Sequence, residues 1–399
     1  MKILWVCGTF LHPTNKGGQI RTLEMLKRLH ERHEIHYVAF QQNGETEGLE
    51  RAVEYSTQAY AIPHAVPARG TVPFFRQLAA NLFSGLPLSV SRYVSPAMRE
   101  VITSLRSKHS FDSVVCDFLF PAPNFSNFDD VVLFEHNVES MIWQRHVESS
   151  SDPLRKAYFG MQYRRMLACE AKACREAAHV IAVSAIDARK IEQMFALSKV
   201  SDIKTGVDVD YFAPTPTTHP KVADLVFVGS MDWLPNIDGV RFFVSEVLPL
   251  ICAKIPAVKL VIVGRTPPAE IQKMAGPNVH VTGTVADIRP YLWGSAVSIV
   301  PLRIGSGTRL KIYESMAAKT AVVSTTIGAE GLVYEDGTNI AIADSAEDIA
   351  RSCIHLIENV ASRASMAQSA FKMVAERFSW PQIAHEFEDL LKKYPARKH

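Results

Sequence analysis

Short apolar runs alternate with amphipathic stretches along the chain, and this alternation predicts parallel β-sheets covered by helices. An apolar run at 3–6 is followed by apolar residues at helical spacing from about Gly18, and then by a second run at 35–40. The same order restarts at residue 223, where 225–228 is the first of several further runs. Continuous apolar strands of this kind are buried on both faces. The pattern therefore predicts an α/β protein with two Rossmann-like sheets.

Residues 203–222 interrupt this pattern with three prolines and little periodicity, which is typical of a linker. A chain of 399 residues is also long for a single hydrophobic core. We therefore expect an N-terminal domain at 1–202, a C-terminal domain at 223–378 and a final helix within 379–399.

The segment 301–324, PLRIGSGTRLKIYESMAAKTAVVS, predicts a strand, a glycine loop, a helix and another strand. Gly305 and Gly307 would let backbone amides approach a ligand, with Ser306 between them. Thr308 is a candidate helix N-cap. Because a helix amino end carries a partial positive charge, the loop has the features of an anion site.

Three charged residues follow the glycine loop. Arg309 and Lys311 bring two positive charges to the helix start, and Glu314 could accept hydrogen bonds from sugar hydroxyls. We interpret the segment as a site for a nucleotide-diphosphate sugar. The alternative is an ordinary crossover between strands with a solvated first turn.

Two features in the first half of the chain are weaker candidates. The pair Gly17–Gly18 precedes a helix and forms either a second glycine loop or a flexible connection. His136 follows a strand at 131–133, at the edge where α/β sheets hold ligands. It could act as a base or a hydrogen-bond donor, or it could be structural, and Asn137 is a candidate helix cap.

Residues 69–96 mix phenylalanines and leucines with arginines. This helical region could bind an acceptor, touch a membrane surface or pack on the domain.

Composition narrows the function classes. The formal net charge is only +2, so the chain is not built as a nucleic-acid binder. The six cysteines form no CxxC pair, which favours reduced thiols in the cytoplasm. We expect no signal peptide, because the first residues lack a basic leader and a long apolar region. No apolar run approaches the ~20 residues that span a bilayer. A cytoplasmic protein is expected, at most peripheral on the inner face of a membrane.

Taken together, the motifs resemble the retaining glycosyltransferases of the GT-B fold, the "group 1" or family 4 set. Their occurrence in this order carries the resemblance, which runs over nearly the whole chain. The pieces are KGG at 16–18, EHN at 135–137, KTGVDVDYFAP at 204–214, FVGSMDWLPN at 227–236, VTGTVADIRPYL at 281–292 and PLRIGSGTRLKIYESMA at 301–317.

This resemblance implies two Rossmann-like domains facing across a cleft, with the donor on the C-terminal domain and the acceptor on the N-terminal one. Glu314 matches the second carboxylate of the family's E-x7-E motif, which holds the ribose. Arg309 and Lys311 match diphosphate partners, and His136 matches a histidine near the sugar. The residues expected at the donor are Gly17, Gly18, Ser230, Arg265, Gly283, Gly305, Ser306, Gly307 and Thr308.

Two positions depart from the family pattern. Ser306 stands where the first glutamate of E-x7-E would fall, so a carboxylate that often contacts the donor sugar is absent. Ser230 stands where many members carry an arginine. Both departures leave the donor sugar open, but the diphosphate site rests on backbone amides and cations.

The resemblance implies transfer from a nucleotide-diphosphate sugar to a hydroxyl of a glycan, a lipid-linked sugar or a small molecule, with retention. No metal or other cofactor is expected, because the Asp-x-Asp at 208–210 lies in the linker. An epimerase, a phosphorylase and a non-catalytic nucleotide-sugar-binding protein are the alternatives.

Overall fold

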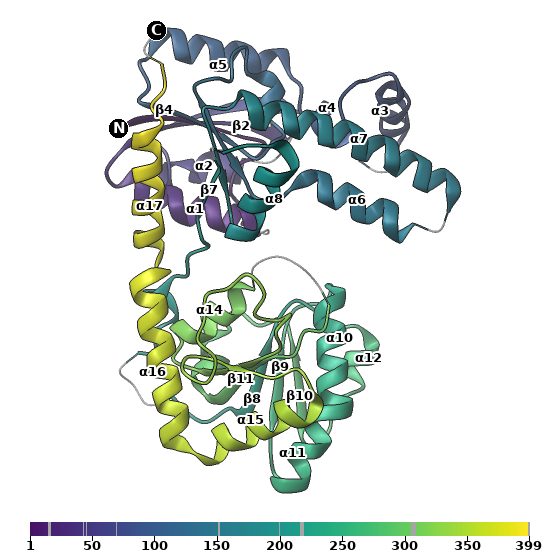
Figure 1. Cartoon of the computed structure of the whole chain (residues 1–399), viewed down its shortest axis with the longest axis vertical. Helices are drawn as coiled ribbons and strands as arrows, with labels where there is room; N and C mark the ends of the chain where they lie inside the picture. Colours follow the sequence, from purple (N-terminus) through teal and green to yellow (C-terminus); the bar gives the residue numbers. More distant parts are fainter. Residues whose placement is uncertain are drawn as a thin grey trace. The chain divides into compact units, whose positions relative to one another are not determined.

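The computed structural model describes residues 1–14, 17–42, 44, 46–68, 70–150, 152–198, 200–215, 219–304 and 309–397. The chain forms two compact units, Met1–Lys204 with Ile383–His399, and Thr205–Gln382. Each unit is built around one parallel β-sheet (Figure 1). The expected fold class, two Rossmann-like domains, is therefore confirmed.

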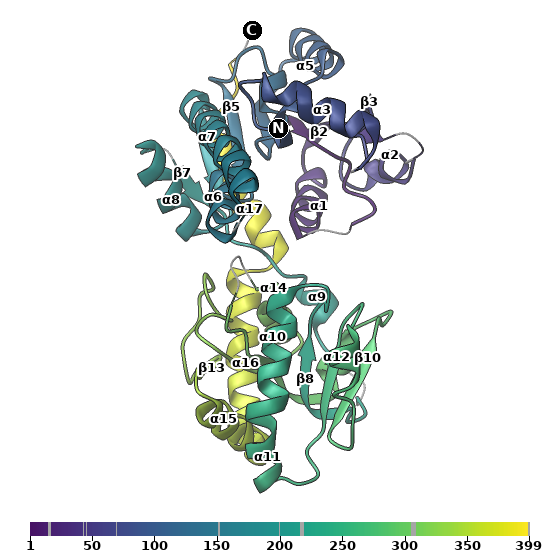
Figure 2. The same cartoon turned by 90° about the vertical axis from the view of Figure 1, so that its right-hand side faces the viewer.

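The first unit alternates strands and helices in the order expected of a Rossmann-like fold. Its strands are β1 (Lys2–Cys7), β2 (Glu34–Gln42), β3 (Gln58–His64), β4 (Ser113–Asp117), β5 (Val131–Glu135), β6 (His179–Ala182) and β7 (Val200–Asp202). Its helices are α1 (Gly17–His30), α2 (Glu47–Glu50), α3 (Val72–Leu82), α4 (Leu88–Ser91), α5 (Pro96–Lys108), α6 (Glu139–Ser149), α7 (Pro153–Glu176) and α8 (Ala185–Phe195). Helices α6 and α7 pack side by side (Figure 2).

The second unit repeats this alternation. Its strands are β8 (Ala223–Val228), β9 (Leu260–Val263), β10 (Val279–Gly283), β11 (Ser295–Val300), β12 (Ala321–Ser324) and β13 (Ala341–Ile342). Its helices are α9 (Val209–Phe212), α10 (Leu234–Phe242), α11 (Leu248–Lys254), α12 (Ala269–Gln272), α13 (Arg289–Trp293), α14 (Leu310–Ala317), α15 (Ala346–Glu358) and α16 (Val360–Arg377). Helix α17 (Trp380–Lys393) starts in this unit and continues in the first.

The strand order defines where each sheet can hold a ligand. It is β3-β2-β1-β4-β5-β6-β7 in the first unit and β10-β9-β8-β11-β12-β13 in the second. The chain therefore reverses its direction of progress between β1 and β4, and again between β8 and β11. Open α/β sheets bind ligands beyond the carboxyl ends of the strands at such switch points.

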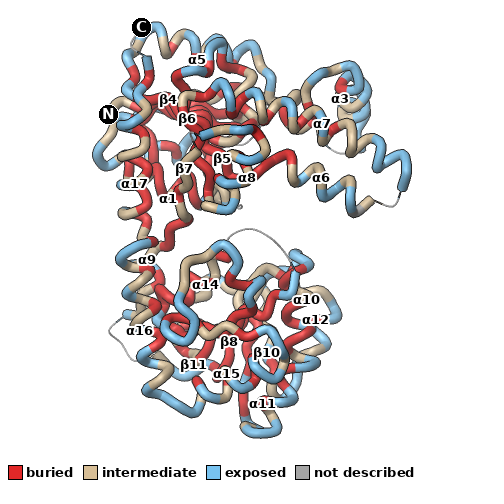
Figure 3. The backbone as a smooth tube through the Cα atoms, in the orientation of Figure 1, coloured by how far each residue is buried: buried red, intermediate tan, exposed pale blue. Residues whose placement is uncertain are grey.

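Alternate side chains of each strand enter different cores. Leu225 and Phe227 of β8 pack in one apolar cluster, and Val226 packs in another. Figure 3 shows buried segments concentrated in the strands of both units. Helices cover both faces of such a sheet, which explains why its strands appear in the sequence as continuous apolar runs.

The structure corrects several element boundaries. Strands β3, β7 and β13 were not predicted; the last two have only three and two residues. The pair Gly17–Gly18 belongs to the first turn of α1 and not to a loop. The helical stretch after β8 begins at Leu234 and is divided by a π-helical turn at Phe243–Val247.

The two predicted helix caps, Asn137 and Thr308, are not the N-cap residues that the structure describes. Val138, and not Asn137, occupies the N-cap position of α6, and the Asn137 amide instead donates to the carboxylate of Glu139. The N-cap position of α14 is Arg309, and Thr308 lies outside the described residues.

Within the described part of the chain, no helix is long and apolar enough to cross a lipid bilayer.

Candidate functional site

The loop after β8 and the start of α14 meet at the switch point of the second sheet. Lys311, in the first turn of α14, donates from Nζ to the Asn236 side-chain oxygen at 2.8 Å. The same ammonium lies 4.6 Å from the ring centre of Phe227, in β8. A Cβ atom on Gly229 would come within 2.6 Å of Nζ, so a larger residue there would displace the lysine from this position.

Burial shifts the two charged groups of α14 in opposite directions. It lowers the pKa of Lys311 to about 7, although nearby Glu314 opposes the shift. It raises the pKa of Glu314 to about 7, with Lys311 again opposing. An anion that reached Lys311 would restore the stability of its charged form. The expected position of these residues near a phosphate is therefore chemically reasonable, and their role stays a prediction.

Arg309 adds a second cation at the amino end of α14. The residue is 5% exposed, and its guanidinium lies 5.0 Å from the ring centre of Trp233. Burial lowers its pKa, partly offset by Glu330. Gly305, Ser306, Gly307 and Thr308, expected to hold the donor, lie outside the described residues.

Ser230 and Arg265 form a polar cluster across the ends of β8 and β9. The Arg265 Nε donates to the Ser230 hydroxyl at 2.8 Å, and that hydroxyl donates to Asp232. A second Arg265 nitrogen lies 3.5 Å from the other oxygen of Asp232. A Cβ on Gly264 would collide with the carbonyl of Gly229, so the two loops touch along their backbones. The structure thus places the Arg265 guanidinium against Ser230, the position at which many members of the family carry an arginine.

Gly283 ends β10 with a φ of +72°, a conformation that favours glycine, and no atom lies within 4 Å of a Cβ built there. Its surroundings are open, as expected for a backbone contact to a ligand.

In the first unit, His136 is fixed by Asp117 at the end of β4. The His136 Nε2 lies 2.7 Å from one Asp117 oxygen, and the other oxygen accepts from Trp5 Nε1 and Thr22 Oγ1. The Phe118 ring stacks on the imidazole with centres 3.9 Å apart. Asp117 is fully buried, so these donors satisfy a carboxylate that has no access to water.

This arrangement determines which His136 nitrogen is available to a ligand. Burial lowers the pKa of His136, with Asp117 opposing, so the imidazole is neutral at neutral pH. Because the Asp117 side chain also accepts from Trp5 and Thr22, we assign it as the acceptor of the His136 bond, so Nε2 carries the proton and Nδ1 keeps its lone pair. Nδ1 is buried, has no partner among the described residues, and would lie 3.4 Å from a Cβ on Gly18. His136 is therefore an acceptor toward the start of α1, not the donor that was also considered.

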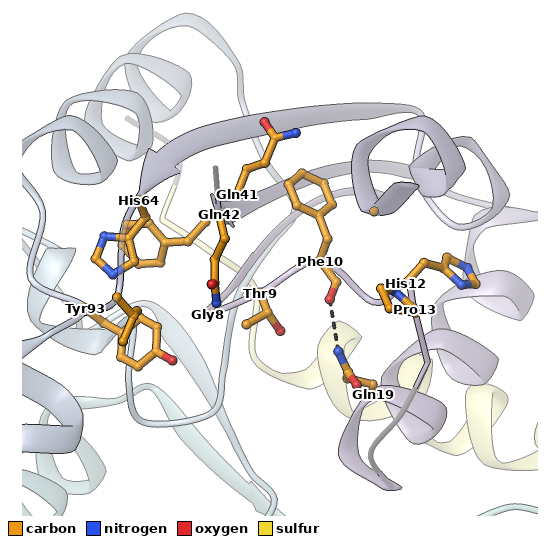
Figure 4. Close-up of a pocket in the computed structure, with 13 residues that line it drawn as sticks. Gly8, Thr9, Phe10, His12, Pro13, Gln19, Gln41, Gln42, His64 and Tyr93 are labelled. Atoms are coloured by element: carbon orange, nitrogen blue, oxygen red, sulfur yellow. Dashed lines mark hydrogen bonds between the residues drawn. The ribbon is translucent and has the colours of Figure 1, made fainter. Parts of the chain in front are cut away.

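A pocket of about 170 Å³ opens at the carboxyl ends of β1, β2 and β3 (Figure 4). Figure 4 shows His64 and Tyr93 at one end and His12 at the other. Burial lowers the pKa of both histidines. No Lys, Arg, Asp or Glu is among its 13 described lining residues, which are Gly8, Thr9, Phe10, His12, Pro13, Gln19, Phe40, Gln41, Gln42, Gly48, His64, Val66 and Tyr93.

Sequence reasoning missed the residues that position the expected ones. Asn236 holds Lys311, Asp232 holds Arg265, and Asp117 holds His136. Each follows or ends a predicted strand, which is the one signal that could have identified them. Among the described residues, no cluster of three His, Cys, Asp or Glu side chains is arranged to hold a metal ion.

Known proteins resemble this chain in sequence. Residues 223–359 match the family described as glycosyl transferases group 1. An uncharacterized 44.6 kDa protein in the cps region of Klebsiella pneumoniae is 21% identical over 96% of this chain and 97% of its own length. The phosphatidyl-myo-inositol mannosyltransferase of Mycolicibacterium smegmatis is 30% identical over 51% of this chain. That alignment spans 54% of the mannosyltransferase.

Solved structures resemble the chain over its whole length. Anabaena Alr3699/HepE, crystallised in complex with UDP, covers 98% of this chain and 100% of its own, with a TM-score of 0.67 and 15% identity. Sucrose-phosphate synthase from Thermosynechococcus elongatus covers 98% and 99%, with a TM-score of 0.69 and 14% identity. At such identities the likeness concerns the fold, and both neighbours share the two-unit α/β architecture with this chain. Residues 223–359 therefore resemble the group 1 glycosyl transferases, and the chain as a whole shares the GT-B fold of these solved structures.

Proposed function

We propose that the chain transfers a hexosyl group from a nucleotide-diphosphate sugar to an acceptor hydroxyl with retention of the anomeric configuration, in the synthesis of a glycan, glycolipid or glycoside. The observation that carries the proposal is the half-buried Lys311 ammonium, whose pKa is lowered to about 7, beside buried Arg309 at the amino end of α14. A desolvated cation stabilises charge more strongly than a hydrated one, and the leaving diphosphate gains charge as the glycosidic bond breaks.

The other site residues receive supporting roles in this proposal. Glu314 accepts hydrogen bonds from the ribose, and His136 accepts one from a sugar hydroxyl through Nδ1. UDP, seen in the Anabaena structure, supports a diphosphate donor in this chain. We further propose that no divalent metal takes part, because the cations of the second unit stand where a metal would neutralise the diphosphate.

The direct test is an assay of nucleotide sugars against acceptor glycans, lipid-linked sugars and small molecules in the presence of a chelator. We expect a glycoside product whose anomeric configuration, read by NMR, equals that of the donor. Lys311→Met should lower kcat/KM by about 10²- to 10³-fold, the usual cost of one lost transition-state charge contact. Activity that needs added Mn²⁺ would contradict the metal proposal. Epimerised sugar nucleotide, phosphate-dependent cleavage or binding without turnover would each favour an alternative function.

The pKa of Lys311 predicts how donor affinity changes with pH. In the free protein this pKa is about 7, so the ammonium loses its proton as pH rises above that value. A bound diphosphate favours the charged form, so binding above pH 7 takes up a proton and weakens as pH rises. Ionisation of Glu314, whose pKa is also about 7, acts in the opposite direction, because ribose hydroxyls that donate to Glu314 favour its ionised form.

Calorimetry with UDP should therefore show affinity falling by up to about tenfold per unit from about pH 7 to about pH 9. The heats in buffers of different ionisation enthalpy should report proton uptake. Lys311→Met provides the control, because its weaker binding should no longer fall as pH rises above 7. An affinity of the unaltered protein that stays constant over this range would rule out the role given to Lys311.

Arg265 is proposed to replace the arginine that many family members carry at the position of Ser230. It reaches the Ser230 hydroxyl from the neighbouring strand end and is oriented by Asp232. Arg265→Gln should weaken UDP binding about ten- to hundredfold, as expected for a hydrogen bond to a charged group. Arg241→Gln is the matched control, since Arg241 is an exposed arginine of the same unit paired with Glu270. Equal affinities of the two variants would remove Arg265 from the donor site.

The uncharged pocket of the first unit is proposed to hold a neutral sugar unit of the acceptor. Side-chain amides and aromatic faces suit hydroxyls and pyranose rings, and an acidic ligand would find no Lys or Arg among the described lining residues. Gln42→Ala should raise the acceptor KM about two- to tenfold, the value of one hydrogen bond, and leave the donor KM unchanged. Gln368→Ala, an exposed position on α16, is the control. An unchanged acceptor KM in Gln42→Ala would place the acceptor elsewhere.

A further inference from the structure

Helix α3 presents an apolar stripe to solvent. Positions 72, 75, 79, 82 and 83 follow helical spacing, and the large side chains among them are exposed. The exposed fractions are 65% for Val72, 57% for Phe75, 50% for Leu82 and 94% for Phe83, which follows the helix directly. A soluble helix normally turns such a stripe toward the core, so this orientation requires an explanation.

The opposite face of α3 is anchored by a buried polar network, which fixes the apolar stripe outward. Asn81, 3% exposed, donates to the Leu86 carbonyl and the Ser91 hydroxyl and accepts from Gln162 of α7. Arg165 of α7 donates to the carbonyls of Asn81 and Leu82. Rotation of α3 about its axis would break these bonds, so the helix cannot bury its apolar face against its own unit.

The stretches of chain that carry this stripe and lie beside it are basic, although α7 continues to Glu170 and Glu176 beyond them. Residues 55–99 and 153–169 contain eight Lys and Arg and no Asp or Glu, although the whole chain has a net charge of only +2. Arg76 lies on α3 next to Phe75. Arg92 and Arg165 lie close to Tyr158, where their charges oppose the rise that burial causes in the pKa of Tyr158. In the described part of the chain, Arg76, Arg92 and Arg164 form no ion pair with a carboxylate. Their charge remains available to an external anion.

We propose that this surface, Val72, Phe75, Arg76, Leu82 and Phe83 of the α3 region with Arg92 and Arg165 beside it, docks on an anionic lipid bilayer. Exposed phenylalanines can enter the boundary between headgroups and acyl chains, and arginines pair with lipid phosphates. An acidic protein would satisfy the charges, but it would leave the apolar stripe without a partner of matching chemistry.

The docking surface is continuous in sequence with the pocket of the first unit. Val66 and Tyr93 line that pocket, and the segment between them carries α3 and its apolar stripe. An enzyme held at a bilayer through this segment would have its pocket walls next to lipid-borne acceptors. The docking proposal itself does not depend on the transfer reaction, because a vesicle can be bound without turnover.

The test is co-sedimentation of the full chain with vesicles of phosphatidylcholine alone and of phosphatidylcholine mixed with phosphatidylglycerol. We expect binding to the anionic vesicles that weakens with salt. The double variant Phe75→Ser, Phe83→Ser should lower the partition coefficient at least about tenfold. Arg76→Gln should lower it about fivefold on anionic vesicles alone.

The matched control is Val53→Ser, Val360→Ser, which removes two exposed apolar side chains outside the docking surface. It should bind vesicles as the unaltered chain does, and circular dichroism should show all variants folded. Equal binding to the two kinds of vesicle, or full binding by the phenylalanine variant, would overturn the proposal. A dimer that the phenylalanine variant dissociates in sedimentation velocity would assign the surface to a second copy of the chain instead.

Discussion

Both sheets of this protein are parallel, and that constraint explains where its chemistry lies. A parallel connection must return over the face of the sheet, so every strand ends at the same edge and every following loop begins there. Gly8, Asp117 and His136 reach this edge in the first unit, and Ser230, Arg265 and Lys311 reach it in the second. The switch points then select which of these loops face one another.

Each unit stabilises one buried charged or titratable centre at this edge. Asp117 accepts hydrogen bonds from three side chains and thereby fixes the His136 tautomer. Among the described residues, Lys311 donates to neutral Asn236 and lies against an aromatic face, with the Glu314 carboxylate nearby. The first arrangement serves to position a side chain. In the second, burial lowers the pKa of Lys311, and a bound anion would restore the stability of its charged form, which is the physical reason to expect a phosphate there.

The fold class followed from the sequence because buried parallel strands leave a strong signal of apolar runs. That signal missed β7 and β13, which are too short to show an apolar run. Helical periodicity also missed the start of α10, which begins at Leu234 directly after Trp233. Of the candidate site, His136, Arg309, Lys311 and Glu314 were identified from their places after strands and at a helix start. Their partners Asp117 and Asn236 were not, because hydrogen bonds across 19 and 75 residues have no local pattern.

The sequence by itself determined two Rossmann-like sheets, a basic glycine-loop segment before α14 and the family resemblance, because these depend on periodicity and on residues close in the chain. Only the tertiary structure decided that Arg265 stands beside Ser230, that His136 offers an acceptor, and that the apolar stripe of α3 faces outward. Each of these depends on which face of an element is held by a distant side chain. For α3 that side chain is Gln162 of α7, far away in sequence, and hydrophobic spacing alone does not say which way a helix turns.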